Sequence, residues 1–532
     1  MIASGRRHDY DFVVIGSGFG GSVSALRLSE KGYRVLVIEQ GKRWRADDFP
    51  RSNWNLRRWL WLPFLRFFGF FKITIFRHVT VLSGVGVGGG SLVYANTLPV
   101  PKRDFFTSPS WAHLADWERE LEPFYQTAYR MLGATENPKL FAGDLALKKL
   151  AGELGREKEF EPTKVAVFFG EPEKTVPDPY FGGAGPERAG CTFCAGCMIG
   201  CRYNAKNTLD KNYLYFAEKH GAEIWPEKRV YGVKPLNEAD GSGGYRILWR
   251  ASTGFSRDRG EVTARGIVFS GGVLGTVPLL LKLKRTTLPR LSDRIGYGIR
   301  TNSESLIGVT TLDKNITFSE GVAIGSILRT DEHSHLEPVR YPSGSGFWRL
   351  LMSPQVHGAN AAVRILRAIL DGLRHPIRNL RVYFVRDWAK RTQILLYMRT
   401  IDTSLRFKQG VLGTATALDT GPAPTPFMSE AKTLAEQYAR IVRGKPMVLL
   451  TETLMGTSTT AHILGGAVMG RSPDEGVIDR DNRVFGYRNL WICDGSMISA
   501  NPGVNPSLTI TALSERAMSK IPAKKDNPDF QP

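Results

Sequence analysis

The sequence predicts an α/β protein that begins with a Rossmann-like dinucleotide-binding unit, and three features of the first forty residues support this fold class. An apolar run at 11–15 (DFVVI) ends at a group of glycines. A segment with helical apolar spacing follows at 22–31, and a second apolar run occupies 34–39 (RVLVIE). Short apolar runs bounded by turn residues are typical of buried strands. Strand, helix and strand within about thirty residues form a βαβ unit.

Length and composition place the chain among large globular proteins. It has 532 residues, of which 42% are hydrophobic and 23% are charged. This balance excludes a disordered, collagen-like or coiled-coil chain. The length is above the size at which a single hydrophobic core stops growing, so two or three domains are expected.

The charge is strongly basic. Lysine and arginine number 71 and aspartate and glutamate 51, a formal net charge of +20. Such an excess favours contact with an anionic partner, either phospholipid, nucleic acid or an acidic protein. No nucleic-acid-reading motif accompanies the charge, so a nucleic-acid partner is not expected.

The glycines after the first strand fit the dinucleotide fingerprint G-x-G-x-x-G. Gly16 would form the tight turn, Gly18 would let the backbone approach a pyrophosphate, and Gly21 would let the helix pack on the strand. Glu39 ends the second strand, where a carboxylate can bind the ribose hydroxyls of the adenosine. An acid at this position favours NAD or FAD over NADP.

Four motifs, of which the first contains this fingerprint, carry a family resemblance. In chain order they are GSGFGGSVSALRLSEKGYRVLVIEQG from Gly16, GVGVGGGSLVYAN at 84–96, FSGGVLGTVPLLL from Phe269, and the pair HILGG at His462 with DGSMISANPGVNPSLTITALSERAM from Asp494. Together they resemble the glucose–methanol–choline (GMC) flavin oxidoreductases, and within them the cholesterol-oxidase-like branch.

The resemblance implies a Rossmann-like FAD-binding domain assembled from discontinuous segments, together with a substrate domain built from an antiparallel sheet and helices. We expect the FAD-binding domain to use 8–100, 190–300 and 450–522. The substrate-binding region would then comprise 101–189 and 301–449.

The resemblance also implies the residues that contact FAD. The positions that match the family motifs are Gly88, Gly89, Ser91 and Asn96 along the flavin, Val230 at the adenine, and Asp494 and Gly495 on the ribityl side. The residues themselves agree with a long cofactor. A second glycine-rich loop far from the first would let the backbone approach both the pyrophosphate and the flavin ring.

His462 and Asn505 match the catalytic pair of the family. The flavin supplies the redox chemistry, and the protein must take up the hydroxyl proton of an alcohol. Histidine suits this task because its pKa lies near neutrality, and the amide of Asn505 can orient the substrate oxygen. The expected activity is FAD-dependent oxidation of a secondary, apolar, sterol-like alcohol to a ketone.

Two other functions remain open at the level of sequence. The first is an FAD and iron–sulfur dehydrogenase of another lipid or terpenoid alcohol, which would pass electrons to a carrier protein instead of oxygen. The second is a non-catalytic flavin- or membrane-binding protein, and the presence of both His462 and Asn505 argues against it.

The family's sterol oxidases also carry a glutamate that assists migration of the steroid double bond. Glu337, in SHLEPVRYP, is the candidate here, although no motif aligns it. The alternative is that Glu337 is a solvated surface acid.

Four of the five cysteines fall within eleven residues. Cys191, Cys194, Cys197 and Cys201 have the spacing C-x2-C-x2-C-x3-C, which resembles a ferredoxin run. An iron–sulfur cluster, a zinc site, and free thiols or disulfides are the alternatives. Cys493 is expected to be a small buried apolar residue.

Two segments suggest contact with an anionic membrane. One is the aromatic stretch 59–76, which is either core or an interfacial segment. The other is the basic stretch 364–391, which is either an exposed basic helix or a lipid-binding one. No run of 18 uncharged apolar residues is present, so no spanning helix is expected. Arg6 and Arg7 precede no apolar signal segment, so we expect a cytoplasmic protein in peripheral contact with the inner face of the membrane.

Overall fold

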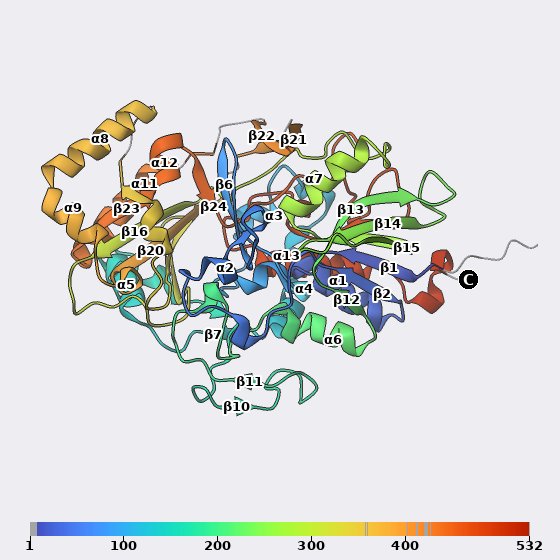
Figure 1. The fold of residues 1–532 in the computed structure, drawn as a ribbon, viewed down its shortest axis with the longest axis horizontal. Helices are drawn as coiled ribbons and strands as arrows, with labels where there is room; N and C mark the ends of the chain where they lie inside the picture. The colour runs from blue at the N-terminus through green and yellow to red at the C-terminus, as the bar shows by residue number, and fades with distance from the viewer. Residues whose placement is uncertain are drawn as a thin grey trace, which may run out of the picture.

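Two large β-sheets organise the chain in the computed structural model, one on the right and one on the left of Figure 1. The structure describes residues 8–356, 358, 360–401, 403–410, 413–419, 424–425 and 427–530. Arg6 and Arg7 lie outside the described residues.

The first sheet contains the predicted βαβ unit. Its strands, in spatial order, are β12 (Glu223–Trp225), β2 (Val35–Ile38), β1 (Tyr10–Ile15), β15 (Arg259–Phe269), β14 (Tyr245–Ala251) and β13 (Lys228–Pro235), and β25 (Leu490–Ile492) pairs with the end of β15. The first four strands and β25 are parallel, whereas β14 and β13 form an antiparallel meander. Because these strands come from distant parts of the sequence, the nucleotide-binding domain is discontinuous, as predicted.

Helices that are distant in sequence pack together beside this sheet. They are α1 (Phe19–Glu30), α4 (Trp117–Leu132), α6 (Tyr213–Lys219) and α13 (Ser507–Ser519), while α7 (Val273–Lys284) contacts β13. The predicted first helix begins three residues earlier than its sequence suggested. Ser22 N donates to Gly18 O at 2.8 Å, so the glycines already belong to the helix.

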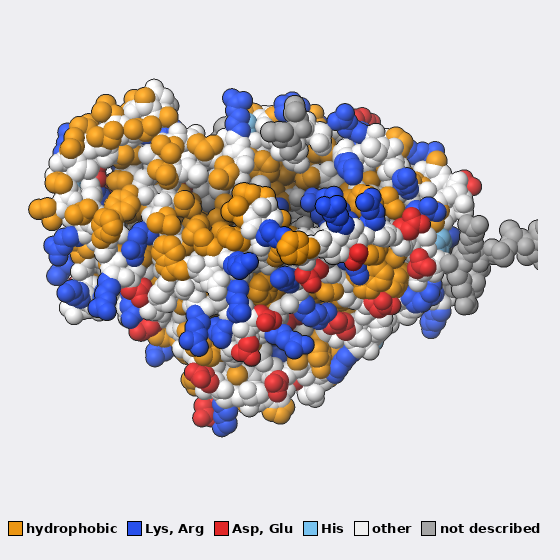
Figure 2. All heavy atoms as spheres, in the orientation of Figure 1, with side chains coloured by type: hydrophobic (Ala, Val, Ile, Leu, Met, Phe, Trp, Pro, Cys, Tyr) orange, Lys and Arg blue, Asp and Glu red, His pale blue; other side chains and the backbone are white. Residues whose placement is uncertain are grey.

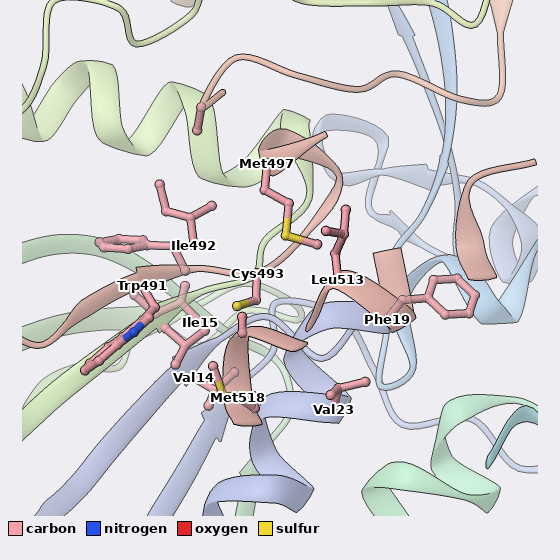
Figure 3. Packing of buried hydrophobic residues seen from close by; sticks show 14 of the residues in the cluster. Val14, Ile15, Phe19, Val23, Trp491, Ile492, Cys493, Met497, Leu513 and Met518 are labelled. Atoms are coloured by element: carbon pink, nitrogen blue, oxygen red, sulfur yellow. The ribbon is translucent and has the colours of Figure 1, made fainter. Parts of the chain in front are cut away.

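Apolar side chains make up the core around Cys493. Figure 3 shows side chains from β1, α1, β25 and α13 meeting around Cys493, which has no exposed surface. The prediction for Cys493 is therefore confirmed. Glycine is required where α1 approaches this core, because a Cβ at Gly20 would lie 1.7 Å from the carbonyl oxygen of Cys493.

The second sheet is antiparallel along its whole length. Its order is β19 (Met352–Pro354), β23 (Gly444–Leu449), β16 (Ser305–Thr311), β20 (Thr392–Arg399), β18 (Ser334–Val339), β17 (Ser326–Arg329) and β8 (Phe160–Pro162). Helices α5 (Ala142–Glu153) and α11 (Ser429–Ile441) pack on it. The predicted fold class is thus confirmed, and the predicted domain boundaries stay a prediction.

Smaller elements connect the two sheets. A three-stranded sheet joins β24 (Ser458–Thr460), β6 (Val79–Gly84) and β5 (Phe71–Ile75). The short strand pairs are β3 (Trp61–Leu62) with β4 (Phe67–Phe68), β7 (Thr135–Glu136) with β9 (Lys164–Val165), β10 (Thr175–Val176) with β11 (Arg188–Ala189), and β21 (Leu405–Gly410) with β22 (Gly413–Leu418). Two short helices also belong to this part of the chain, α2 (Leu56–Trp59) and α3 (Arg103–Phe106).

The aromatic stretch 59–76 is partly core and partly surface. Trp59, Phe70 and Phe71 are buried, whereas Phe64 and Leu65, at the tip between β3 and β4, are exposed. Part of this stretch is therefore core, and its contact with a membrane stays a prediction.

The basic stretch is helical and lies at the upper left of Figure 1. It forms α8 (Ala361–Arg374), α9 (Pro376–Tyr383) and α10 (Trp388–Arg391), and α12 (Leu450–Met455) packs against α8. Within the described residues, no helix is long and apolar enough to cross a membrane.

Candidate active site

A cavity of about 1080 Å³ lies between the two large sheets. The glycine turn after β1 lines one part of it, and apolar side chains of the second sheet line another. His462 and Asn505 line the cavity as well, so the structure brings together the nucleotide fingerprint and the predicted catalytic pair.

The fingerprint end of the cavity has room for a pyrophosphate. Gly16 and Gly18 line it, and a Cβ built on Gly18 would meet no atom within 4 Å. The N-terminus of α1 opens here, so its free backbone N–H groups and helix dipole favour an anion. Gly21 does not line the cavity. A Cβ there would lie 2.1 Å from Gly16 O, which is the close helix–strand packing that was predicted.

Glu39 lies at the cavity wall and is buried. Its carboxylate accepts hydrogen bonds from Ser17 Oγ at 2.8 Å and from the backbone N–H of Gly41 at 2.8 Å. Burial raises the pKa of this carboxyl, and the hydrogen bonds oppose the rise. Val230 lines the same end of the cavity. An acid next to an apolar residue suits the ribose and adenine of a dinucleotide.

Asp494 and Gly495 line the cavity from the segment after β25. Asp494 is held by the backbone N–H of Gly272 at 2.9 Å and by Thr276 Oγ1 at 2.5 Å. Burial raises the pKa of Asp494, while hydrogen bonds from Ser496, Thr276 and Gly272 lower it. These contacts hold the carboxylate in one place beside the cavity.

The second glycine loop reaches the cavity only in part. Gly89 lines it, and a Cβ there would lie 2.6 Å from Gly18 Cα, so the two glycine loops touch. Gly88, Ser91 and Asn96 do not line the cavity. Ser91 Oγ donates to Gly88 O at 2.7 Å and shapes the loop from inside.

The residues present fit FAD. The cavity joins an open glycine cradle to an apolar chamber, and Gly89 brings the second loop against the first. Asn96 is fully buried and its amide has no partner within the described chain, but it does not line the cavity. With FAD bound, the glycine turns and Glu39 would hold the dinucleotide part.

His462 is paired with a carboxylate that the sequence did not reveal. Its Nδ1 lies 2.9 Å from Oε2 of Glu304, which is fully buried. The same carboxylate accepts from the backbone N–H of Ala461 at 2.8 Å and from Thr460 Oγ1. Since Nδ1 donates to Glu304, Nε2 is the ring nitrogen left to accept a proton.

The electrostatics of His462 have opposing contributions. Burial lowers the pKa of the imidazole, but the charge and hydrogen bond of Glu304 and the charge of Glu337 outweigh burial and raise it above the ordinary value. A more basic imidazole with a fixed orientation is suited to accept a proton from an alcohol.

Asn505 lies in the cavity wall and contacts a third acid. Its Nδ2 donates to Glu337 Oε2 at 3.3 Å, and its Oδ1 is buried without a partner in the described chain. Glu337 has no exposed surface, and its Oε1 lies 3.4 Å from His335 Nε2. The reading of Glu337 as a surface acid is therefore wrong.

The sheet register shows where the Glu337 side chain points. Glu337 pairs with Leu396 across β18 and β20, and Val339 follows two residues later on the same strand. Directly paired residues, and residues two apart on a strand, share one face of a sheet. Leu396 and Val339 line the cavity, so Glu337 points to the same side of the sheet; it does not itself line the cavity but contacts the lining residue Asn505.

Glu304 is the functional candidate that sequence reasoning missed. It lies 158 positions from His462 and belongs to no recognised motif. It follows two residues with left-handed backbone, Asn302 and Ser303, at the start of β16. The contact of β16 with β24 and the bridge between Arg300 and Leu464 bring it beside His462.

The predicted metal site is not supported by the geometry. Residues 191–201 are all described, and in the described chain no group of three or more His, Cys, Asp and Glu side chains could hold a metal ion. Cys191, Cys194, Cys197 and Cys201 are free cysteines, and Cys191 and Cys197 are buried in an apolar cluster. Burial raises the pKa of Cys197 to about 11, which favours the thiol.

The structure therefore gives no support to the iron–sulfur cluster or to the zinc alternative, and both stay predictions; Cys191 and Cys197 are buried, while Cys194 and Cys201 are partly exposed. The four cysteines share one loop, in which Phe193 and Ala195 have left-handed backbone with φ of 55° and 57°.

Family models agree with both ends of this site. A model described as GMC oxidoreductase matches residues 386–514, which include His462, Asp494 and Asn505. A model for an NAD(P)-binding Rossmann-like domain matches residues 14–51, which include the fingerprint and Glu39.

Similar proteins extend over the whole chain. A cholesterol oxidase of Acinetobacter baumannii is 47% identical, covering 98% of this chain and 95% of its own length. A cholesterol oxidase of Mycobacterium tuberculosis strain H37Rv is 44% identical, covering 97% and 92%. The crystal structure of pyridoxine 4-oxidase from Mesorbium loti superposes with a TM-score of 0.60 at 14% identity, over 96% of this chain and 99% of that one, and so shows a shared fold.

Proposed function

Because this chain belongs to the GMC oxidoreductases, in the branch of the cholesterol oxidases, we propose that it oxidises the hydroxyl of a sterol to a ketone with FAD. The observation that carries the proposal is the His462–Asn505 pair, which lies in the wall of the cavity that the FAD loops enter.

The apolar part of the cavity suits a fused hydrocarbon ring system. This part of the cavity is lined by apolar side chains of the second sheet and of the segments next to its strands. They are Leu306, Ile324, Val339, Tyr341, Trp348, Met352, Ile394, Leu396 and Leu449. Burial of apolar surface supplies about 25 cal/mol per Å². A ligand that is mostly hydrocarbon gains most from such a wall.

In the oxidation step, the protein manages the hydroxyl proton. When bound, the flavin accepts the hydrogen of the carbinol carbon as a hydride. His462 Nε2 takes the hydroxyl proton, and Glu304 stabilises the imidazolium that results. Asn505 Nδ2 gives one N–H to Glu337, and its second N–H would donate to the substrate oxygen and hold it beside His462.

An anaerobic assay tests this function. Mixed with a 3β-hydroxysterol, the protein is expected to lose its oxidised flavin absorbance and to yield the 3-ketone. Long-chain primary alcohols serve as the comparison. Faster flavin reduction by such an alcohol than by any sterol would contradict the sterol assignment.

Glu304→Gln is expected to shift the pH dependence of the enzyme. His462 must be neutral to accept a proton, so kcat/KM falls as pH drops through its pKa. Glu304 raises that pKa, so removing its charge moves the acid limb to lower pH, and kcat falls at least about tenfold as the imidazole becomes less basic.

The measurement is a kcat/KM profile with sterol as substrate. Glu304→Asp should recover part of the shift, and Glu332→Gln, at an exposed glutamate, should leave the profile unchanged. An acid limb that stays in place in Glu304→Gln would limit Glu304 to a structural role.

Glu337 supports a second reaction on the same product. Oxidation of a 5-ene-3β-ol gives a 5-en-3-one, whose C4 proton is acidified by the new carbonyl. Glu337 would remove that proton and return it at C6, so the double bond moves into conjugation with no net redox change. The supporting observations are that Glu337 is buried against the lining residue Asn505 and that its Oε1, 3.4 Å from His335 Nε2, makes no hydrogen bond in the described chain.

Glu337→Gln is expected to separate the two reactions. The variant should release the unconjugated 5-en-3-one, because an amide cannot carry the proton, and conjugation should slow by about 10²–10⁴-fold. The conjugated product is followed by its near-ultraviolet absorbance. If conjugation proceeds at the wild-type rate in this variant, another group moves the proton.

The electron acceptor and the location complete the proposal. We propose molecular oxygen as the acceptor, supported by relatives named as oxidases. A carrier protein is the alternative electron acceptor. Turnover that occurs only with dye acceptors would favour it.

We also propose a cytoplasmic protein in peripheral contact with the membrane. The free state of Cys191, Cys194, Cys197, Cys201 and Cys493 supports this, since a reducing compartment keeps thiols unpaired.

A further inference from the structure

Helix α8 has its apolar face turned away from the protein. Its exposed large side chains are Ile365, Leu366, Ile369, Leu370 and Leu373. At 100° per residue these positions cover about 140° of the helix circumference, a single apolar face. The buried residue of α8 is Arg364. This arrangement is the reverse of a helix that packs on a soluble core.

Polar side chains of α8 and α9 bind these two helices to the rest of the protein. Arg364 Nε donates to Thr453 O at 2.8 Å, and Arg378 donates to Gly444 O at 2.9 Å. Asp371 pairs with Lys445 and accepts from Asn379 Nδ2 at 2.9 Å. Since these contacts use the polar groups, the outward direction of the apolar face is set by the fold.

The apolar surface continues over neighbouring elements. Exposed large apolar residues follow on α9, just beyond it, on α12 and before β19, namely Ile377, Leu380, Phe384, Leu450, Leu454, Met455 and Leu350. Figure 2 shows apolar side chains gathered at the upper left, where Figure 1 places α8 and α9. Leu373 is 72% exposed, Ile377 73% and Phe384 75%. Apolar patches of this kind mark interaction sites.

The charges around this surface indicate which kind of partner it fits. Residues 361–391 contain eight basic residues and two acidic ones. The acids are already engaged, Asp371 with Lys445 and Asp387 with Ser343 Oγ at 2.7 Å. Arg374, Arg381 and Arg386 are exposed. Apolar side chains next to exposed arginines match a bilayer, where the hydrocarbon receives the former and anionic phosphates receive the latter.

The same surface leads to the cavity. Met352 lines the cavity while Leu350, two residues earlier, is exposed, and Leu449 lines it while Leu450 is exposed. Helix α8 contacts both β19, which begins at Met352, and α12, which begins at Leu450. The outward apolar face and the cavity wall are therefore neighbours.

We propose that α8, α9 and α12 form a docking surface that seats the protein on an anionic phospholipid bilayer with the cavity wall against it. The proposal rests on the proposed function, in which the substrate is an alcohol dissolved in lipid. The apolar side chains would enter the outer part of the hydrocarbon, and the arginines would remain at the phosphates.

The test uses the FAD-bound protein and vesicles of phosphatidylcholine with phosphatidylserine. The triple variant Leu373→Gln/Ile377→Gln/Leu380→Gln is expected to lose at least about tenfold in vesicle partitioning. Its turnover of sterol held in vesicles should fall in parallel, while turnover of sterol carried by cyclodextrin should remain at the wild-type value. Leu145→Gln, at an exposed leucine of α5, is the matched control and should change neither.

A charge variant separates the two contributions. Arg374→Gln/Arg381→Gln/Arg386→Gln should weaken binding to vesicles that contain phosphatidylserine, and its remaining binding should lose most of its salt sensitivity. Equal vesicle binding by the wild type and the apolar triple variant would overturn the proposal. A wild-type dimer that becomes a monomer in the triple variant would overturn it too, because the face would then be a self-interface.

The same experiments distinguish a failure of the proposed function from a failure of the docking surface. If the wild type binds vesicles through this surface yet oxidises no sterol from cyclodextrin, the docking surface stands and the substrate assignment falls. If cyclodextrin sterol is oxidised but the surface does not bind vesicles, the function stands and the docking surface falls.

Discussion

Replacing His462 with alanine is expected to lower kcat by about 10²–10⁴-fold while the protein keeps its flavin. The imidazole is the group we propose to take the hydroxyl proton, and Glu304 holds it with Nε2 free. A loss of this size corresponds to about 3–5 kcal/mol of transition-state stabilisation. The measurements are steady-state turnover with a sterol and the flavin-to-protein absorbance ratio.

The control separates chemistry from folding. His220→Ala changes an exposed histidine and should leave turnover unchanged. Near-normal turnover in His462→Ala would assign the proton transfer to another group. A variant without flavin would instead mean that His462 maintains the cavity.

Replacing Gly18 with valine is expected to yield a folded protein that has lost its flavin. The backbone of Gly18, at φ −71° and ψ −165°, is open to any residue, and a Cβ there meets no protein atom within 4 Å. The side chain would enter the cradle in which the pyrophosphate must lie, so FAD affinity should fall by at least about tenfold. Far-ultraviolet circular dichroism and flavin content are the two measurements.

Gly20→Ala is the informative comparison. Its Cβ would lie 1.7 Å from Cys493 O inside the core, so this variant should be destabilised even without cofactor. The melting temperature of Gly18→Val should equal that of wild type stripped of FAD, because ligand stabilisation is then absent from both. Normal flavin content in Gly18→Val would place the dinucleotide elsewhere.

The electron-transfer prediction from the cysteine run shows a limit of sequence spacing. The spacing of Cys191, Cys194, Cys197 and Cys201 constrains how far apart the sulfur atoms lie along the chain. It does not constrain the backbone conformation between them. In the structure all four are free cysteines, and Cys191 and Cys197 lie in an apolar cluster.

The docking surface shows a similar limit. Apolar spacing and a run of arginines predict an amphipathic helix over the basic stretch, and both features are local. Which side of α8 faces the protein depends on Thr453 and Lys445, which lie far away in sequence and bind Arg364 and Asp371. An apolar face is core or surface according to what the fold places opposite it.

The sequence by itself determined the features that depend on short stretches of chain. The turn at Gly16, the close packing at Gly21 and the acid at Glu39 follow from residue type and spacing, because their physical constraints act within one βαβ unit. The resemblance of the motifs to the GMC family likewise implied the discontinuous FAD-binding domain, the antiparallel sheet and the pair His462 and Asn505.

Only the tertiary structure decided how the distant acids meet that pair. Glu304 reaches His462 because β16 lies beside β24, and Glu337 points to the same side of the sheet as Leu396 because of the β18–β20 register. Each contact joins residues more than fifty positions apart. A strand carries no local signal of which strand will pair with it. The electrostatics of the site therefore arise from the assembled sheet.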